Sequence, residues 1–170
     1  MVRIRRWVAA AAMALIGAAS GAQGAAAQLV STHEDWRVYV ADEGDERICY
    51  AVSDPIDKAP RTVDHGRVAF MLASWRSGAA IEQPSFHAGY QLKPGAPTRA
   101  RVGSARYKMF VDGREGFVED VGDERRLIRD MKRAFVMRVE AVSVRGTATA
   151  YEFSLKGVTN ALRAMQNECR

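Results

Sequence analysis

The sequence predicts a mainly β protein, an antiparallel β-sandwich or meander with two short helices, one internal and one C-terminal. Short segments of alternating polarity, separated by turns rich in Gly, Pro and Asp, are typical of antiparallel strands. Only two stretches have apolar residues at helical spacing. The 170 residues contain no internal repeat or linker, which predicts a single domain.

The N-terminal segment has the layout of a secretory signal peptide. Three arginines within the first six residues precede an apolar run from Val8 to Ala19, and small residues follow up to Ala27. We expect residues 1–27 to be removed and residues 28–170 to form one β-rich domain. The alternative is an uncleaved anchor helix.

Charge and compartment narrow the possible partners. Removal of the signal takes away three arginines and no acid, and lowers the formal net charge from +5 to +2. So small a charge argues against a nucleic-acid partner. We expect a location in the periplasm or cell envelope, with association with the outer membrane left open. No transmembrane span is expected after signal removal, and no cofactor. The sequence identifies neither a partner nor an oligomeric state.

The first half of the expected domain alternates in several places. Leu29–Glu34 shows no pattern and is expected to be a lead-in, whereas Asp54–Gly66 holds two prolines and is expected to be a loop. Arg67–Arg76 is apolar on both faces, which predicts a central strand covered on both sides. The other expected strands of this half are Trp36–Val40, Arg47–Ser53 and the weaker Ser85–Gln91.

In the second half, close turns predict an antiparallel meander. Asp112–Gly113 is a tight turn, and Arg145–Gly146 joins the last two strands as a hairpin. The expected strands are Thr98–Val102, Tyr107–Val111, Gly116–Val118, Phe135–Val144 and Thr147–Leu155.

The internal helix is expected over Asp123–Ala134. Acidic residues lie in its first turn and basic residues in its last, which matches the helix dipole. Its apolar stripe consists of Leu127, Ile128 and Met131. We expect its charged face to be solvated.

The two cysteines, Cys49 and Cys169, are expected to form a disulfide. An exported chain meets an oxidising compartment, in which a single pair of cysteines usually bonds; two buried free thiols are the alternative. Cys169 continues the apolar stripe of the C-terminal helix, and Cys49 shares its strand face with the small residue Ala51, which leaves room for a helix. Two cysteines cannot complete a structural zinc site, and we expect no metal site.

Several segments resemble the invasion-associated locus B family. They are Cys49–Pro55, Val68–Trp75, Met131–Arg133, Ser143–Thr147 and Tyr151–Gly157. The resemblance implies a secreted bacterial envelope protein with a β-rich fold. The family takes its name from a role in the invasion of host cells by some pathogens, and it brings no catalytic residues to carry over.

No catalytic signature is present. The sequence lacks a nucleophile elbow, a zinc-protease helix and a phosphate loop. His33, His65 and His87 are not expected to be catalytic. Trp36 and Trp75 are expected in the core. Tyr39, Tyr90 and Tyr107 could line a surface patch, which would indicate a binding face.

Two functions follow as hypotheses. The first is a non-enzymatic, exported interaction protein that contributes to host-cell attachment or invasion. The second is a periplasmic hydrolase with a site built from loop residues such as Asp64, His65 and Arg76. A pocket holding a close histidine–carboxylate pair would favour the hydrolase, whereas a continuous apolar or aromatic patch on an open sheet edge would favour the interaction protein.

Overall fold

The computed structural model describes residues 26–170; the expected signal peptide lies outside the described residues, apart from its last two positions. The first strand begins at Gln28, the residue that cleavage after Ala27 would leave at the N-terminus. The prediction of a mainly β fold with one internal and one C-terminal helix is confirmed. The strands are β1 (Gln28–His33), β2 (Trp36–Glu43), β3 (Glu46–Ser53), β4 (Asp57–Ala59), β5 (Ala69–Trp75), β6 (Gln83–His87), β7 (Thr98–Val102), β8 (Ala105–Asp112), β9 (Glu115–Val118), β10 (Val136–Val142) and β11 (Ala148–Ser154).

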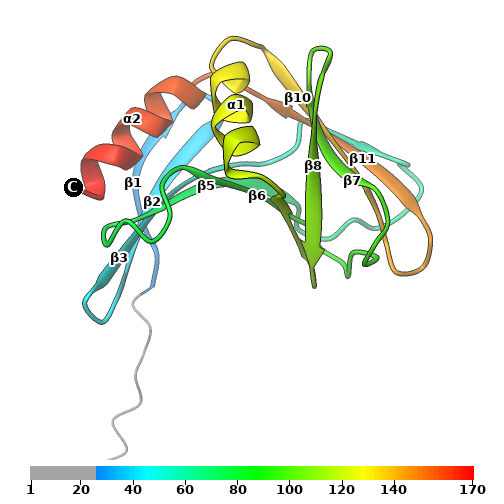
Figure 1. The fold of residues 1–170 in the computed structure, drawn as a ribbon, viewed down its shortest axis with the longest axis horizontal. Helices are drawn as coiled ribbons and strands as arrows, with labels where there is room; N and C mark the ends of the chain where they lie inside the picture. The colour runs from blue at the N-terminus through cyan, green and yellow to red at the C-terminus, as the bar shows by residue number, and fades with distance from the viewer. Residues whose placement is uncertain (1–25) are drawn as a thin grey trace, which may run out of the picture.

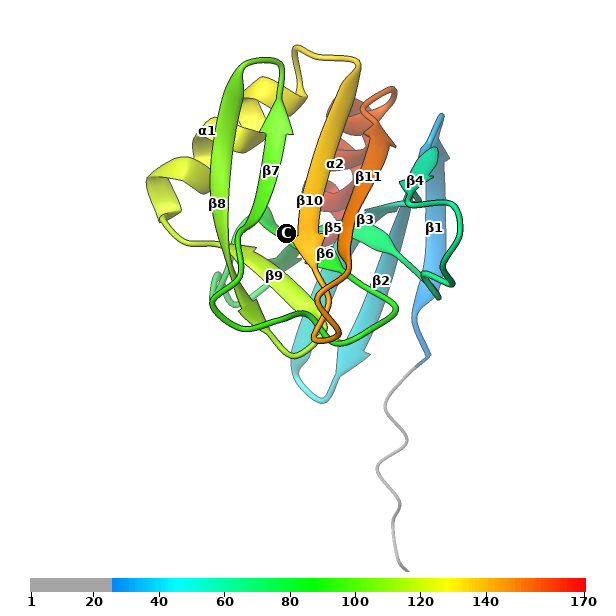
Figure 2. The ribbon, with the colours of Figure 1, turned by 90° about the vertical axis from the view of Figure 1, so that its right-hand side faces the viewer.

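All the strands belong to one open antiparallel sheet. Their order is β1-β2-β3-β5-β6-β9-β8-β7-β10-β11-β4, so β1 and β4 are the edges. The sheet is strongly curved, and β10 and β11 stand across from β5 and β6 rather than in the same plane (Figure 1, Figure 2). A single curled sheet therefore produces two facing layers, as a sandwich would, without a second sheet.

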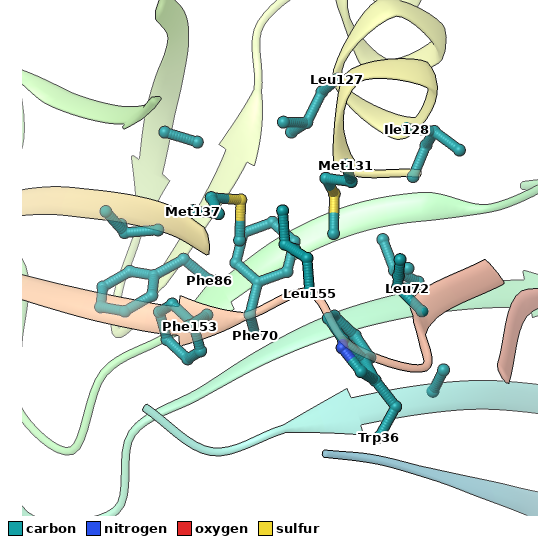
Figure 3. Close-up of a cluster of buried hydrophobic side chains, with 14 of the residues drawn as sticks. Trp36, Phe70, Leu72, Phe86, Leu127, Ile128, Met131, Met137, Phe153 and Leu155 are labelled. Carbon is teal, nitrogen blue, oxygen red and sulfur yellow. The ribbon is translucent and has the colours of Figure 1, made fainter. Parts of the chain in front are cut away.

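The core fills the concave side of this sheet, which we call the inner face. Aromatic side chains meet across the fold: the ring centroids of Phe70 on β5 and Phe153 on β11 are 5.8 Å apart. Phe86 on β6 lies 5.3 Å from Tyr151 on β11. Figure 3 shows the three phenylalanine rings beneath Leu127, Ile128 and Met131 of the internal helix. Trp36 is fully buried, as predicted, and its indole Nε1 donates a hydrogen bond of 3.0 Å to the carbonyl oxygen of Ser154.

The internal helix, α1 (Val121–Met131), begins and ends earlier than predicted. The Asp120 carboxylate accepts a hydrogen bond from the backbone N–H of Asp123, so Asp120 is the N-cap. The apolar stripe is buried as predicted, with Leu127, Ile128 and Met131 against the inner face. Lys132 and Arg133 lie beyond the last turn, not within it.

The C-terminal helix, α2 (Val158–Glu168), also packs on the inner face, against β1, β2, β3 and β5. It starts after Gly157, whose φ of 87° and contact with the His33 carbonyl leave no space for a Cβ atom. The predicted stripe is confirmed: Val158, Leu162 and Met165 are buried.

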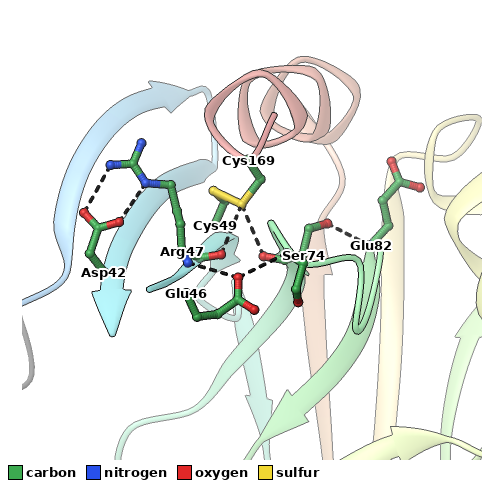
Figure 4. The surroundings of a disulfide bond; sticks show 8 residues. Asp42, Glu46, Arg47, Cys49, Ser74, Glu82 and Cys169 are labelled. Carbon is green, nitrogen blue, oxygen red and sulfur yellow. Dashed lines mark hydrogen bonds and ion pairs between the residues drawn. A yellow bond between two sulfur atoms is a disulfide. The ribbon is translucent and has the colours of Figure 1, made fainter. Parts of the chain in front are cut away.

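The disulfide between Cys49 and Cys169 is confirmed, with 5.8 Å between the two Cα atoms. Figure 4 shows the bond between the end of α2 and β3. Cys49 and Ala51 are fully buried on the inner face of β3, which is the face where small residues were expected to admit the helix. The bond therefore fastens the C-terminal end of α2 to β3, which lies between β2 and β5 in the sheet.

Three local predictions are wrong. The expected lead-in is β1, an edge strand with a bulge between Leu29 and Ser31 that breaks its alternation. The expected loop contains β4, a three-residue edge strand paired with β11. β5 is central, between β3 and β6, but only its inner face is fully covered, since Met71 and Trp75 on the other face are half-buried. Trp75 is therefore not a core residue.

Candidate functional site

The convex side of the sheet carries apolar and aromatic side chains on β2, β3, β5, β9 and β8, with polar side chains on β6 between β5 and β9. Cross-strand pairing places them next to one another: Tyr39 is opposite Tyr50, Ile48 is opposite Trp75, and Phe110 is opposite Phe117. We call this surface the aromatic face and define it as Tyr39, Ile48, Tyr50, Met71, Trp75, Phe110 and Phe117. None of the seven is fully buried, and Phe110 is 50% exposed.

The rings of the aromatic face pack in pairs. The centroids of Tyr39 and Tyr50 are 5.4 Å apart and those of Phe110 and Phe117 are 5.5 Å apart, both pairs stacked. Burial against the sheet raises the pKa of Tyr50 above its usual value, so this phenol stays neutral. Both helices lie on the other side of these strands (Figure 1). Within residues 26–170, no helix covers the aromatic face.

A hollow of about 530 Å³ opens in this surface. Its apolar end is lined by Ile48, Tyr50, Met71 and Trp75, and its polar end by Gln83, Ser85, His87 and Glu115. The lining includes the carboxylates of Glu43 and Glu115 and no lysine or arginine. The hollow therefore suits a neutral or cationic group better than an anion.

The polar end contains a hydrogen-bonded series of three side chains. His87 Nδ1 lies 3.3 Å from a Glu115 carboxylate oxygen, and His87 Nε2 lies 2.9 Å from Ser85 Oγ. Ser85 and His87 are two residues apart on one face of β6, and Glu115 is opposite His87 on β9. Burial lowers the pKa of His87, and the charge of Glu115 offsets part of that lowering.

This geometry resembles the Ser–His–carboxylate arrangement of hydrolases, but it lacks one part. Acyl transfer also needs N–H donors aimed at the developing oxyanion, usually backbone groups. Ser85 pairs with Met71 on one side and Phe117 on the other, in the interior of the sheet, where backbone N–H groups are taken by the ladder. Ser85 is also only 5% exposed. The arrangement is therefore better suited to holding a ligand than to cleaving one.

The protonation of His87 should make the stability of the fold depend on pH. Because the pKa of His87 in the folded state is below its usual value of 6.5, the unfolded chain binds more protons. We expect the free energy of unfolding to fall as the pH drops from about 7 to 5, and to fall less in the His87→Gln variant. Urea denaturation at both pH values measures this. Glu115→Gln, which removes the offsetting charge, should steepen the loss; a wild type no more acid-sensitive than His87→Gln would contradict the prediction.

The residues proposed for a loop-built site do not come together. Asp64 and His65 precede β5, whereas Arg76 follows it, at the opposite end of the strand. The Asp64 carboxylate accepts a hydrogen bond from the backbone N–H of Gly66, and the Arg76 guanidinium donates one to the carbonyl of Asp45. The prediction that these three residues form one site is therefore wrong.

Both ring nitrogens of His65 form hydrogen bonds within the fold. Its Nε2 is 2.9 Å from the carbonyl oxygen of Pro60, which can only accept, so Nε2 carries the proton. Its Nδ1 then accepts from the hydroxyl of Tyr151 at 2.7 Å. Burial raises the pKa of Tyr151, which keeps that hydroxyl protonated. The hydroxyl oxygen of Tyr151 is also 2.8 Å from the hydroxyl oxygen of Tyr90.

The predicted tyrosine patch is correct for one residue of three. Tyr39 belongs to the aromatic face. Tyr107 is 1% exposed and donates a hydrogen bond to Asp130, and burial raises its pKa to about 12. Tyr90 is half-buried, and its hydroxyl oxygen lies 2.6 Å from the hydroxyl oxygen of Thr149 on β11. Neither Tyr107 nor Tyr90 lies on the aromatic face.

Residues 26–170 contain no group of three or more His, Cys, Asp or Glu side chains that could hold a metal ion. Neither helix described for this chain is long and apolar enough to cross a bilayer. Comparison of the chain with known protein families, curated proteins and solved structures finds no match. The disulfide is compatible with export.

Proposed function

We propose that this chain is an exported cell-envelope interaction protein that binds its partner through the aromatic face. The single observation that carries the proposal is a sheet face whose seven apolar and aromatic side chains have no covering element in the described chain. Apolar side chains left uncovered on a sheet are typical of a binding site, and aromatic residues are enriched among those that dominate binding energy.

Charge complementarity describes the partner further. Glu43 and Glu115 are the only charged residues of the hollow apart from His87, whose pKa is lowered. A partner surface that is apolar, with a basic or hydroxyl-bearing group opposite Glu115, fits this lining. The resemblance to the invasion-associated locus B family supports a role at the bacterial surface, with attachment to a host cell as the process it would serve.

The test is binding of the purified protein to the envelope fraction of its host. Replacing Trp75 and Tyr50 together by Ala should weaken binding roughly tenfold or more, because both line the hollow at the centre of the face. Ile56→Ala is the matched control, since Ile56 is 59% exposed before β4 and lies outside the aromatic face. Equal binding by the double variant and the wild type would contradict the proposal.

A hydrolase is the second candidate, favoured by the Ser85–His87–Glu115 geometry. The Ser85→Ala variant separates the two functions. An interaction protein keeps most of its binding without the Ser85 hydroxyl, whereas a serine hydrolase loses its activity and its labelling by a fluorophosphonate probe. Labelling of the wild type at Ser85 would favour the hydrolase over the interaction protein.

A further inference from the structure

One end of the sheet carries the most exposed large apolar side chain of the described residues. Phe135, in the connection between α1 and β10, is 79% exposed, and the next residue, Val136, is 41% exposed. The position of Phe135 is nevertheless fixed, because its carbonyl oxygen accepts a hydrogen bond of 2.9 Å from the backbone N–H of Leu155. A side chain held outward by a fixed backbone is available to a partner without reordering the chain.

Basic side chains surround this residue on one side. Arg133 is exposed two positions before it, and Arg138 shares the outer face of β10 with Val136. Arg101 is paired opposite Arg138, and Arg106 opposite Arg101, on the neighbouring strands β7 and β8. Figure 2 shows the β7–β8 turn and the α1–β10 connection at the same end of the sheet. We call these six residues, Arg101, Arg106, Arg133, Phe135, Val136 and Arg138, the Phe135 tip.

Most of this positive charge is not neutralised. Arg138 contacts the carboxylates of Glu140 and Glu152 at 3.3 and 3.4 Å. Among residues 26–170, Arg101, Arg106 and Arg133 have no carboxylate within 4.0 Å, the ion-pair distance. The β1–β2 turn, next to Gly157 at this end of the sheet, carries the exposed acids Glu34 and Asp35. The tip must therefore approach an anionic surface with its β7–β8–β10 side.

We infer that the Phe135 tip docks on a bilayer that contains anionic phospholipids. The arginines would lie at the level of the phosphate groups, and Phe135 and Val136 would enter the boundary between headgroups and acyl chains. A soluble polyanion would satisfy the arginines equally well but would give the two apolar side chains no apolar medium to enter. The exposed phenylalanine is therefore what favours a lipid surface. This docking uses a different part of the sheet from the aromatic face and does not depend on the proposed function.

Co-sedimentation with vesicles tests the inference, using the full-length gene product as its host processes it. We expect binding to phosphatidylglycerol–phosphatidylcholine vesicles and at least tenfold weaker binding to phosphatidylcholine alone. Phe135→Ser should weaken binding to the mixed vesicles about tenfold, and Arg133→Gln roughly fivefold. Binding should also weaken as salt is raised.

The chain supplies matched controls at the far end of the same strand. Val144, 56% exposed, and Arg145 lie in the turn between β10 and β11. Arg145→Gln makes the same change as Arg133→Gln, and Val144→Ser also replaces an exposed apolar side chain by a serine; both should leave vesicle binding unchanged. Equal binding to the two vesicle types, an absence of binding, or equal losses in tip and control variants would overturn the inference. So would heparin binding as tight as vesicle binding and insensitive to Phe135→Ser, which would identify a polyanion site instead.

Discussion

Cys49→Ala and Cys169→Ala are each expected to lower the free energy of unfolding by about 2–5 kcal/mol. The two cysteines are 120 residues apart in the sequence. A bond that closes so long a loop removes much of the conformational freedom of the unfolded chain, worth about 4–5 kcal/mol in the chain-entropy model. The bond also holds the end of α2 against β3, so its loss should expose the last turns of α2 to protease before the sheet unfolds.

Urea denaturation under non-reducing conditions measures this effect. The two single variants and the double variant should be about equally unstable, because each lacks the same bond and the effects do not add. Reduction of the wild type should reproduce their stability, whereas a reductant should leave the double variant unchanged. Single variants within about 0.5 kcal/mol of the oxidised wild type, a typical value for neutral surface changes, would contradict the prediction.

The disulfide could be predicted from the sequence because each half of the argument is local. The helical stripe that contains Cys169 and the alternation around Cys49 are both visible within about a dozen residues. The expectation of export then supplied the reason to pair the two cysteines. The start of α1 was harder, because Asp120 and Asp123 are both good N-cap residues and only the structure shows which one caps.

The candidate site could not be predicted in the same way, because it depends on non-local pairing. Ser85 and His87 are visibly on one face of a strand, but Glu115 joins them only because β6 pairs with β9 rather than with β7. The aromatic face depends on a second unknown, which is the side of β5 that the helices cover. Alternation identified both apolar faces of β5, but it cannot say which of them receives α1 and α2.

Trp36→Ala is expected to lower the free energy of unfolding by about 3–5 kcal/mol, the usual cost of deleting a fully buried aromatic side chain. Trp36 joins the two facing layers of the sheet, since it begins β2 and its indole donates to the carbonyl of Ser154 at the end of β11. Trp36→Phe keeps most of the packing but leaves that carbonyl without its partner, and should cost about 1–3 kcal/mol.

Trp75→Ala is the matched control, because Trp75 is half-buried on the aromatic face and lies outside the core. Urea denaturation of the three variants, with the disulfide intact, should rank Trp36→Ala as the least stable. If Trp75→Ala cost as much as Trp36→Ala, the outer side of β5 would contribute to stability as a core does. A large loss at Trp36 with little loss at Trp75 would leave the aromatic face free to serve a partner, because its side chains would then contribute little to folding.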